Sequence, residues 1–413
     1  MAPISLPMVQ SRIHFFSALS NHNYRYFWLA SVFTYQARWI EIPALGWIIL
    51  QLTNSPWLVG VVGFCGMFPM ALFGIFAGVL ADRTPGKKLI ILGQTITILA
   101  IATLIVLLNY NLVAFWNIAI ISLIIGTGWT LDFPTRRSMI MHIIGERNSS
   151  NAIIMDSIAL TISIMMGPLY AGLLLTVNSI TTIGIVLCLY IGGLFILQFV
   201  KISNVHFHRP TNSSFEMLKE GFSQLLTNRL LLGVFIITVV SNLLFFPFRT
   251  MIPVFARDVL EVGTILFGVL GFASGIGALI GSIFLGSISE RKSPARLFAY
   301  GVMFAMAMVC IFSLSRFYPL SVLVLFLSGF GIAGFATMQF TLILKGSSEN
   351  VRGRAIGIVM LAIGVQPFGI LLVGATSEIL GVTTAVGITS ALGVLLLILV
   401  VLKFKIFRQA KSF

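Results

Sequence analysis

The sequence predicts an all-α membrane protein with twelve transmembrane helices arranged as two pseudo-symmetric six-helix bundles. Composition is the first reason, since 58% of the 413 residues are hydrophobic and only 9% are charged, whereas soluble domains carry about 25% charged residues. An internal repeat is the second reason. Residues 58–89 match residues 266–297 without a gap, so that Asp82-Arg83 meets Glu290-Arg291. Internal repeats of this kind are typical of membrane transporters built from two halves.

The individual elements follow from apolar runs that are long enough to cross a bilayer. Twelve helices are predicted at residues 21–50, 57–81, 88–108, 114–144, 151–177, 180–200, 229–254, 264–288, 295–314, 319–345, 354–377 and 381–402. They divide the chain into a cytoplasmic lead, a first bundle, a cytoplasmic linker, a second bundle and a basic cytoplasmic tail, at 1–20, 21–200, 201–228, 229–402 and 403–413. Within the linker, apolar residues recur at helical spacing from Phe215 to Leu226 and predict an amphipathic helix on the membrane surface.

The net charge of +14 does not indicate nucleic acid binding, because the basic residues are confined to alternate loops and the two termini. The exceptions among the 26 Lys and Arg residues are Arg38, Arg249, Arg257 and Arg316. Basic residues accumulate on the cytoplasmic side of membrane spans. Both termini are therefore expected to be cytoplasmic, with anionic lipids as partners of the charge.

Other classes of site have little support in the sequence. The first twenty residues lack the apolar core and cleavage site of a signal peptide. Cys65, Cys188 and Cys310 each fall alone within a span, so no disulfide, metal site or cofactor is predicted. No phosphate-binding loop or pair of nucleophile and base is evident, which argues against an enzyme.

A charged loop between the second and third spans carries a family resemblance. The stretch Gly78-Val-Leu-Ala-Asp82-Arg83-Thr-Pro-Gly86-Lys87-Lys88 resembles the loop signature of the major facilitator superfamily. The usual signature has one residue between the arginine and the glycine, whereas Thr84 and Pro85 both intervene here. That departure resembles the drug- and siderophore-exporter branch, which includes the enterobactin exporters.

A second motif supports the same branch. Gly167-Pro168 followed by Gly172 resembles the antiporter signature of helix 5, although Ser163 stands where that signature has a glycine. The resemblance implies the major facilitator fold, alternating access and export. It also implies that the first, fourth, seventh and tenth helices line a central cavity. Asp82 with Arg83, and Glu290 with Arg291, are expected to act as conformational latches together with Gly78, Gly86, Lys87 and Lys88.

Charges inside spans need a reason, since each costs a few kcal/mol on insertion scales. Arg38 and Glu41 lie three residues apart and share a helix face. They are either a self-neutralised pair that fixes helix packing or a substrate and proton site on the cavity wall. The repeat places Arg249 opposite Glu41, which suggests an ion pair that closes the outer mouth. The alternative is that Arg249 extends to the outer head groups.

Two carboxylates lie toward the cytoplasmic side of the first bundle. Asp132 is expected to pair with Arg136 or Arg137 as an inner gate, or else to serve as a second proton or substrate carboxylate. Asp156 is expected to be structural, either capping backbone N–H groups or facing those arginines. Glu378, near an outer helix end, is expected to be solvated.

Aromatic and amide side chains form a second layer of candidates around the cavity. They are Tyr35, Trp39, Trp129, Asn242, Phe246 and Gln339. A cavity lined in this way suits a flat amphipathic organic molecule, while packing in the core or against lipid is the alternative for each ring.

Together with the family resemblance, the sequence predicts a monomeric secondary transporter of a bacterial inner membrane, which the resemblance implies exports a small organic compound, drug-like or siderophore, in exchange for protons. The alternatives are uptake by proton symport and a membrane scaffold or receptor that transports nothing.

Overall fold

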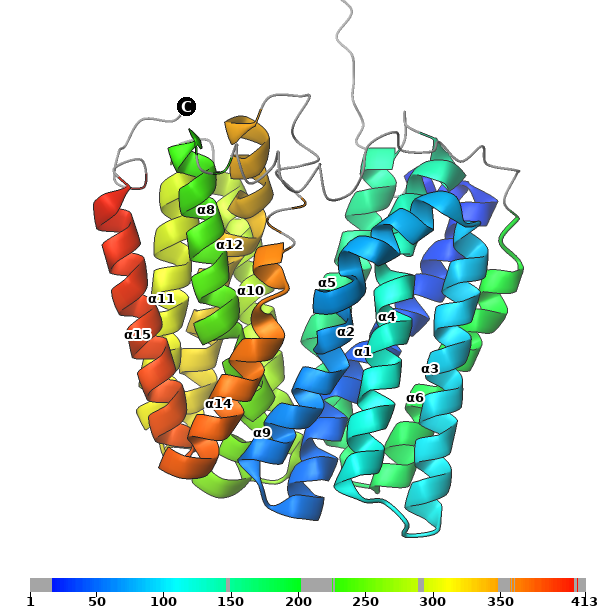
Figure 1. Ribbon diagram of the computed structural model, residues 1–413, viewed down its shortest axis with the longest axis horizontal. Helices are drawn as coiled ribbons and strands as arrows, with labels where there is room; N and C mark the ends of the chain where they lie inside the picture. The colour runs from blue at the N-terminus through cyan, green and yellow to red at the C-terminus, as the bar shows by residue number, and fades with distance from the viewer. Residues whose placement is uncertain are drawn as a thin grey trace, which may run out of the picture.

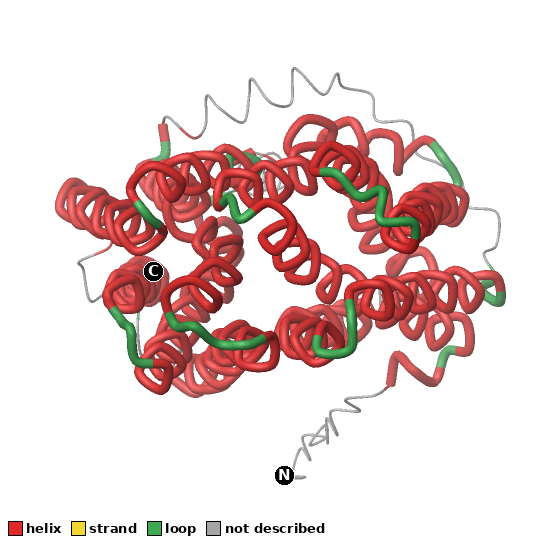
Figure 2. Tube along the Cα trace, turned by 90° about the horizontal axis from the view of Figure 1, so that it is seen from below, coloured by secondary structure: helices red, strands yellow, loops and turns green. Residues whose placement is uncertain are grey.

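The structure, a computed structural model, describes residues 17–145, 149–201, 225, 227–288, 293–347, 357, 359, 361–404 and 407. Every regular element in this part of the chain is a helix (Figures 1 and 2). The amphipathic helix predicted from Phe215 to Leu226 in the linker lies outside the described residues, apart from residue 225.

The first half consists of six long helices that follow the short helix η1 (Ser17–Ser20). They are α1 (His22–Thr53), α2 (Pro56–Arg83), α3 (Gly86–Asn109), α4 (Phe115–Ile144), α5 (Ser149–Leu175) and α6 (Ser179–Gln198). Helix α1 begins where the Asn21 side chain accepts a hydrogen bond from the Tyr24 N–H, 3.1 Å away, and ends at Asn54 in the left-handed conformation. These are ordinary helix caps.

The second half repeats this plan, with an irregular first span. That span, Arg229–Val259, is built from α8 (Arg229–Val240), η3 (Ser241–Phe245), η4 (Phe246–Met251), α9 (Ile252–Val254) and η5 (Phe255–Val259). The remaining helices are α10 (Thr264–Ile288), α11 (Pro294–Leu314), α12 (Tyr318–Gly346), α14 (Gln366–Leu380) and α15 (Val382–Lys403).

The helix predicted at 229–254 is present as a span, but its backbone is not a continuous α-helix. Pro247 and Pro253 have no N–H to donate, so the backbone passes through π and 3-10 turns around them. The span also continues to Val259, beyond its predicted end. This irregular backbone presents Phe246, Arg249 and Thr250 to the interface between the halves.

Helix pairing is the same in the two halves. Helix α1 packs on α5 and α6, while α4 packs on α2 and α3. In the second half, the irregular span packs on α14 and α15, while α12 packs on α10 and α11. The matching pattern is the structural counterpart of the sequence repeat.

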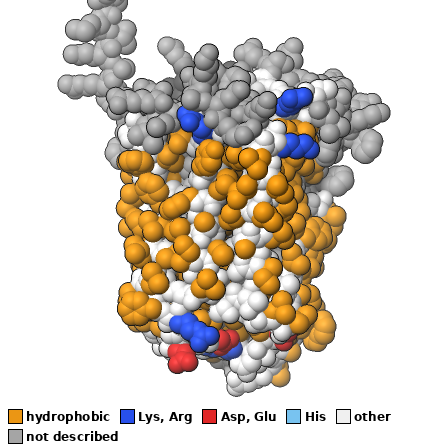
Figure 3. All heavy atoms as spheres, turned by 90° about the vertical axis from the view of Figure 1, so that its left-hand side faces the viewer, with side chains coloured by type: hydrophobic (Ala, Val, Ile, Leu, Met, Phe, Trp, Pro, Cys, Tyr) orange, Lys and Arg blue, Asp and Glu red, His pale blue; other side chains and the backbone are white. Residues whose placement is uncertain are grey.

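The lateral surface is suited to lipid. Hydrophobic side chains cover the face shown in Figure 3, and the charged side chains visible there lie near its two ends. Eleven helices of the described chain are long and apolar enough to cross a membrane. Helix α1 is longer still, with 32 residues, but it contains the buried pair Arg38 and Glu41.

The halves meet near one end of the molecule. The end where α1 begins and α15 ends is called here the terminal end, and the opposite end is called the far end. Helix α2 packs on α14, and α5 packs on α10; the ribbons of the halves converge toward the far end in Figure 1. Both contacts are between glycines: a Cβ on Gly60 would lie 3.0 Å from the Gly374 Cα, and a Cβ on Gly172 would lie 2.9 Å from the Gly268 Cα. Small residues allow such close approach of helices in lipid.

Charged side chains of the second half also hold the α1–α2 corner at the far end. Arg257 Nη1 donates to Leu50 O and Asn54 Oδ1, each 2.8 Å away, at the C-terminus of α1. Glu378 Oε2 accepts from Ser55 Oγ at 2.8 Å and from Trp57 N at 3.0 Å, at the N-terminus of α2. Each charge complements the helix dipole that it faces. Glu378 is exposed as expected, but it also bonds to the other half, which the sequence did not reveal.

Candidate functional site

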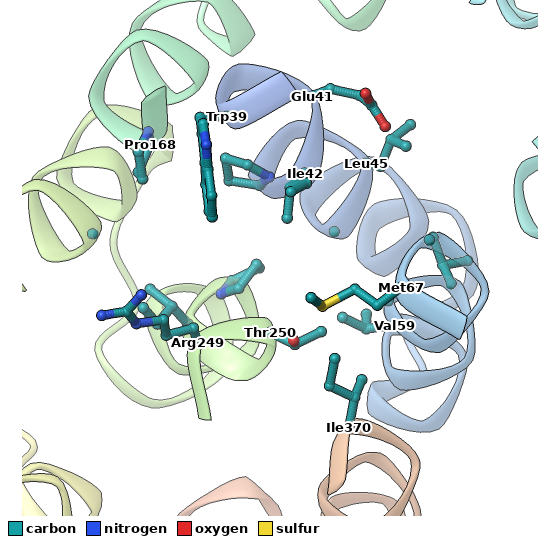
Figure 4. Close-up of a pocket in the computed structure, with 18 of the residues that line it drawn as sticks. Trp39, Glu41, Ile42, Leu45, Val59, Met67, Pro168, Arg249, Thr250 and Ile370 are labelled. Atoms are coloured by element: carbon teal, nitrogen blue, oxygen red, sulfur yellow. The ribbon is translucent and has the colours of Figure 1, made fainter. Parts of the chain in front are cut away.

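A cavity of about 180 Å³ lies between the two halves. Its wall is formed by α1, α2 and α5 of the first half, with Ser122 of α4, and by the irregular span, α10 and α14 of the second (Figure 4). Of the four helices expected to line it, the first and the seventh do so, the fourth contributes Ser122, and α12, the tenth, contributes no described residue. This space is well above the minimum of about 10–15 Å³ that admits one water, and it can hold several waters or one small organic group. Five of the predicted substrate or proton residues line it: Arg38, Trp39, Glu41, Phe246 and Arg249.

The Arg38–Glu41 pair is the most strongly connected feature of the wall. Arg38 Nη1 lies 3.0 Å from Glu41 Oε1, and Arg38 Nη2 donates to Gly66 O at 3.0 Å. The Tyr190 hydroxyl donates to Glu41 Oε2 at 3.2 Å. Both charged residues are buried. The expected pairing on one helix face is therefore present, and the pair borders the cavity.

Arg249 does not pair with Glu41, so the expected ion pair across the outer mouth is absent from the described chain. Both oxygens of Glu41 are engaged by Arg38 and Tyr190. The guanidinium of Arg249 instead lies over the Phe246 ring, 5.5 Å from its centroid. Figure 4 shows Arg249 across the cavity from Trp39 and Pro168.

A second buried network lies inside the first half, away from the cavity. Arg136 Nε is 2.8 Å from Asp132 Oδ1, although the N–H is not well aligned with that oxygen. The Arg136 Nη atoms donate to Ser31 Oγ at 3.0 Å and Thr34 Oγ1 at 3.1 Å. All these partners belong to the first half, so this pair braces α4 on α1. The expected partner of Asp132 is thus found, while its role as a gate stays a prediction.

The remaining predicted residues of the first half fall in or near this network. Asp156 accepts a hydrogen bond from the Tyr35 hydroxyl, with Oδ1 3.1 Å away. Trp129 lies beside the Tyr35 ring, 6.1 Å between centroids, and Arg38 lies over its face at 5.7 Å. The Arg137 guanidinium lies over the Phe133 ring at 5.0 Å. Trp129 therefore connects the network to the cavity pair.

Asn242 and Gln339 are buried together in the second half rather than on the cavity wall. Gln339 Nε2 donates to Thr238 Oγ1 at 2.7 Å, and Asn242 Nδ2 donates to Thr238 O at 2.9 Å. Phe246 and Phe335 are in edge contact nearby, at 5.7 Å.

The predicted latch is described only in part. Gly78, Asp82 and Arg83 belong to α2, but the structure does not describe the side chains of residues 75–83, and Glu290 and Arg291 lie outside the described residues. The end of the motif is visible. Lys87 Nζ donates to Gln198 O and Val200 O, each 2.9 Å away, at the C-terminus of α6, and Lys88 is exposed.

Gly86 packs so closely on α4 that a residue with a side chain would not fit without a shift of its neighbours. A Cβ on Gly86 would lie 2.9 Å from Met139 Sδ. The described part of the motif thus ties α3 to α4 and α6 of the same half.

The antiporter-like motif forms the contact between α5 and its neighbours. Gly167 packs against the backbone carbonyl of Trp39, which leaves no room for a Cβ. Pro168 fills the space beside Gly271, whose Cβ would lie 2.5 Å from Pro168 Cβ. Gly172 packs on α10. The motif therefore joins the two halves beside the cavity.

Tyr190 of α6, whose hydroxyl donates to Glu41, was not predicted from the sequence. Neither were Ser31 and Thr34, which accept from Arg136, nor Gln94, which donates to Thr34. A polar side chain in an otherwise apolar span was the available signal, but its partner depended on which helices meet.

A cavity between two six-helix halves, bordered by a buried ion pair, is typical of a secondary membrane transporter. Over residues 13–412 the chain matches the family described as transmembrane secretion effector, and it belongs to this family of the major facilitator superfamily. Its members are transporters and not enzymes. The resemblance noted in the sequence is thereby confirmed.

Several characterised relatives are exporters or siderophore transporters. The enterobactin exporter EntS of Shigella flexneri is 26% identical, covering 90% of this chain and 92% of that protein. The staphyloferrin A transporter of Staphylococcus aureus is 20% identical over 87% of this chain and 90% of that protein. The multidrug efflux pump Tap of Mycolicibacterium fortuitum is 22% identical over 83% and 86%.

Solved structures show the same fold. The nucleoside transporter NupG superimposes with a TM-score of 0.75 at 14% identity, covering 93% of this chain and 99% of that chain. A bacterial homologue of the human lysosomal transporter Spinster, in an inward-facing conformation, gives a TM-score of 0.70 at 14% identity, covering 94% and 96%.

Proposed function

We propose that this protein exports a small amphipathic organic compound, drug-like or siderophore, across a bacterial inner membrane in exchange for protons. The relatives reported above, which include an enterobactin exporter and a multidrug efflux pump, support export of such compounds. The concentration of basic residues in loops of the terminal end supports a cytoplasmic position for that end. The two halves would rock about the central cavity to expose it alternately to each side.

The observation that carries the proposal is the buried Arg38–Glu41 pair on the cavity wall. When a proton binds Glu41, the carboxylate loses its charge and no longer neutralises Arg38. The freed guanidinium then changes what the wall binds and how α1 packs on α2 through Gly66. Removing one partner of a buried pair costs about 3–5 kcal/mol, which is enough to change the balance between two conformations.

Proton efflux from inverted membrane vesicles with an acidic interior tests this proposal. A pH-sensitive dye reports efflux while lipophilic cations, antibiotics and siderophores are added one at a time. We expect at least one compound to cause efflux with wild-type protein and to cause none with Glu41→Gln, because the amide cannot take up a proton.

The matched control is Glu261→Gln. Glu261 is exposed in the far-end loop and is not part of the cavity wall, so efflux should be unchanged. Equal pH dependence in Glu41→Gln and wild type would show that the proton binds elsewhere. Substrate flux without proton movement would rule out antiport.

A further inference from the structure

Arg249 leaves the cavity wall with an unbalanced positive charge. Among the described residues, three ionisable ones line the wall: Arg38, Glu41 and Arg249. Glu41 is committed to Arg38, at 3.0 Å. No hydrogen bond or ion pair joins Arg249 to any described residue, and its one polar contact is with the face of the Phe246 ring.

A guanidinium inside a membrane span is costly without a partner. It cannot lose its proton, and its planar donors match the oxygens of a carboxylate or similar anion in a two-pronged geometry. Such charge-assisted hydrogen bonds are the strong ones in proteins. The irregular turns around Pro247 place this guanidinium on the cavity wall, so its missing partner is expected to arrive there from solution.

Trp39 lies across the cavity from Arg249 (Figure 4). Its indole nitrogen, which can only donate, has no hydrogen-bond partner within the described chain, and neither has the Ser122 hydroxyl. Both atoms are covered by the surrounding protein and do not reach the cavity surface. Among the described residues of the wall, Arg249 is therefore the uncommitted charged donor that a ligand can meet.

The remaining wall is mainly apolar. Six of the side chains that form it are Ile42, Leu45, Val59, Val62, Met67 and Ile370. These side chains suit a hydrophobic body attached to the anionic group. Because they are apolar, a second charged group on the ligand would find no partner among them. A cationic ligand would be repelled by the positive charge of Arg249, and the negative charge of Glu41 is already balanced by Arg38.

We propose that the substrate is an amphipathic organic anion, whose carboxylate or equivalent oxygens bind Arg249 while its apolar body lies against α1, α2 and α14. This inference rests on the proposed function, because it names the substrate class of the same cavity. It makes Arg249 a specificity-determining residue and separates its role from that of the Arg38–Glu41 pair.

Three probes of similar size and different charge test the inference. They are 1-naphthylacetate, 1-naphthylacetamide and 2-(1-naphthyl)ethylammonium. Binding to purified full-length protein is followed as the ligand-dependent rise in melting temperature, which reports affinity for the folded state. We expect wild type to bind the acetate about tenfold more tightly than the amide, the factor expected from one charge-assisted hydrogen bond, and to bind the ammonium most weakly.

Variants locate the preference. Arg249→Gln should lower acetate affinity to that of the amide and leave amide affinity unchanged. Arg249→Lys should retain part of the preference, because it keeps the charge but loses the two-pronged geometry. Arg316→Gln, the same change at an exposed far-end arginine, should behave as wild type. Should Arg249→Gln fail to fold, wild type and Arg249→Lys still decide the outcome.

Equal binding of the three probes by wild type, or a preference for the acetate that survives in Arg249→Gln, would overturn the inference. The vesicle assay separates this failure from failure of export. Proton-coupled flux of neutral or cationic compounds alone would leave export standing and remove the anion preference. Acetate binding that depends on Arg249, without flux of any compound, would keep the anion site and remove export.

Discussion

Tyr190 connects α6 to the carboxylate of the cavity wall. Its hydroxyl donates to Glu41 Oε2, and its side chain also borders a small hollow shared with Gln94, Trp129 and Asp132. It is thus positioned between the cavity pair and the Asp132–Arg136 pair. A tyrosine that only filled space here would not need its hydroxyl.

Replacing this hydroxyl tests its contribution. Tyr190→Phe should lower the free energy of unfolding by about 1–3 kcal/mol, because a buried charged group loses a hydrogen bond. It should also slow proton-coupled flux, since Glu41 is then held by Arg38 alone. Thermal unfolding and vesicle efflux measure the two effects. Tyr170→Phe, at an exposed position of α5, is the control, and equal behaviour of the two variants would show that the Tyr190 hydroxyl is dispensable.

Two buried ion pairs could be predicted from the sequence, whereas the contacts of two other buried residues could not. Arg38 with Glu41, and Asp132 with Arg136, were predictable because three or four residues along a helix bring side chains together. The isolation of Arg249 and the contact of Tyr190 were not predictable. They depend on helix rotation and on the partner that each span meets, and a single sequence records neither directly.

At the scale of elements, the α1–α2 corner is bound by two oppositely charged residues of the second half. Arg257 holds the end of α1, and Glu378 holds the start of α2. The two hydrogen bonds of Arg257 and the two of Glu378 would all have to break for the α1–α2 corner to separate from the second half. Because these groups are partly or largely exposed, their combined contribution is small, about 1 kcal/mol after solvent screening.

The double variant Arg257→Gln with Glu378→Gln should therefore favour the conformation with an open far end by about fivefold. Spin labels at exposed positions of the far-end loops of each half would report this as a larger population at long distance. The two single variants should each give a smaller shift, and Arg316→Gln should give none. An unchanged distance distribution would mean that the glycine contacts alone close this end.

Sequence patterns specified the elements better than their internal geometry. Most apolar runs predicted spans close to the observed bounds, because lipid demands about twenty apolar residues and internally satisfied backbone. For the span predicted at 354–377, the structure describes Leu361–Leu380 continuously, so the predicted end is too early and the predicted start lies outside the described residues. The irregular course of Arg229–Val259 was not expected. Pro247 and Pro253 signalled it, but a proline in a span can produce a bend, a π turn or a 3-10 turn, and packing selects among them.

At the scale of the whole molecule, the repeat in the sequence becomes a pair of equivalent contacts. Helix α2 meets α14 at Gly60 and Gly374, and α5 meets α10 at Gly172 and Gly268. The cavity is bordered by the same helices. Closure of the far end and the shape of the cavity are therefore coupled, because the halves cannot separate at these glycines without widening the space between Trp39 and Arg249.

A bulky residue at one of these contacts should open the far end. A Cβ on Gly172 would collide with the Thr264 carbonyl oxygen, so Gly172→Leu should destabilise the observed packing by about 1–3 kcal/mol. A conformation in which α5 and α10 separate does not incur this cost and should gain population. Gly184→Leu is the control, since nothing lies within 4 Å of a Cβ there.

Accessibility of the cavity from each side measures the effect. Thr250, on the cavity wall, is changed to cysteine after Cys65, Cys188 and Cys310 are replaced by alanine. A membrane-impermeant maleimide is then applied to right-side-out and inverted vesicles. With Gly172 intact, labelling should occur mainly in inverted vesicles, because the far end is closed and the terminal end is proposed to be cytoplasmic. Gly172→Leu should add labelling in right-side-out vesicles. If labelling occurs only in inverted vesicles, the α5–α10 contact does not close the far end. The hydrogen bonds of Arg257 and Glu378 to the α1–α2 corner would then be what keeps the far end closed.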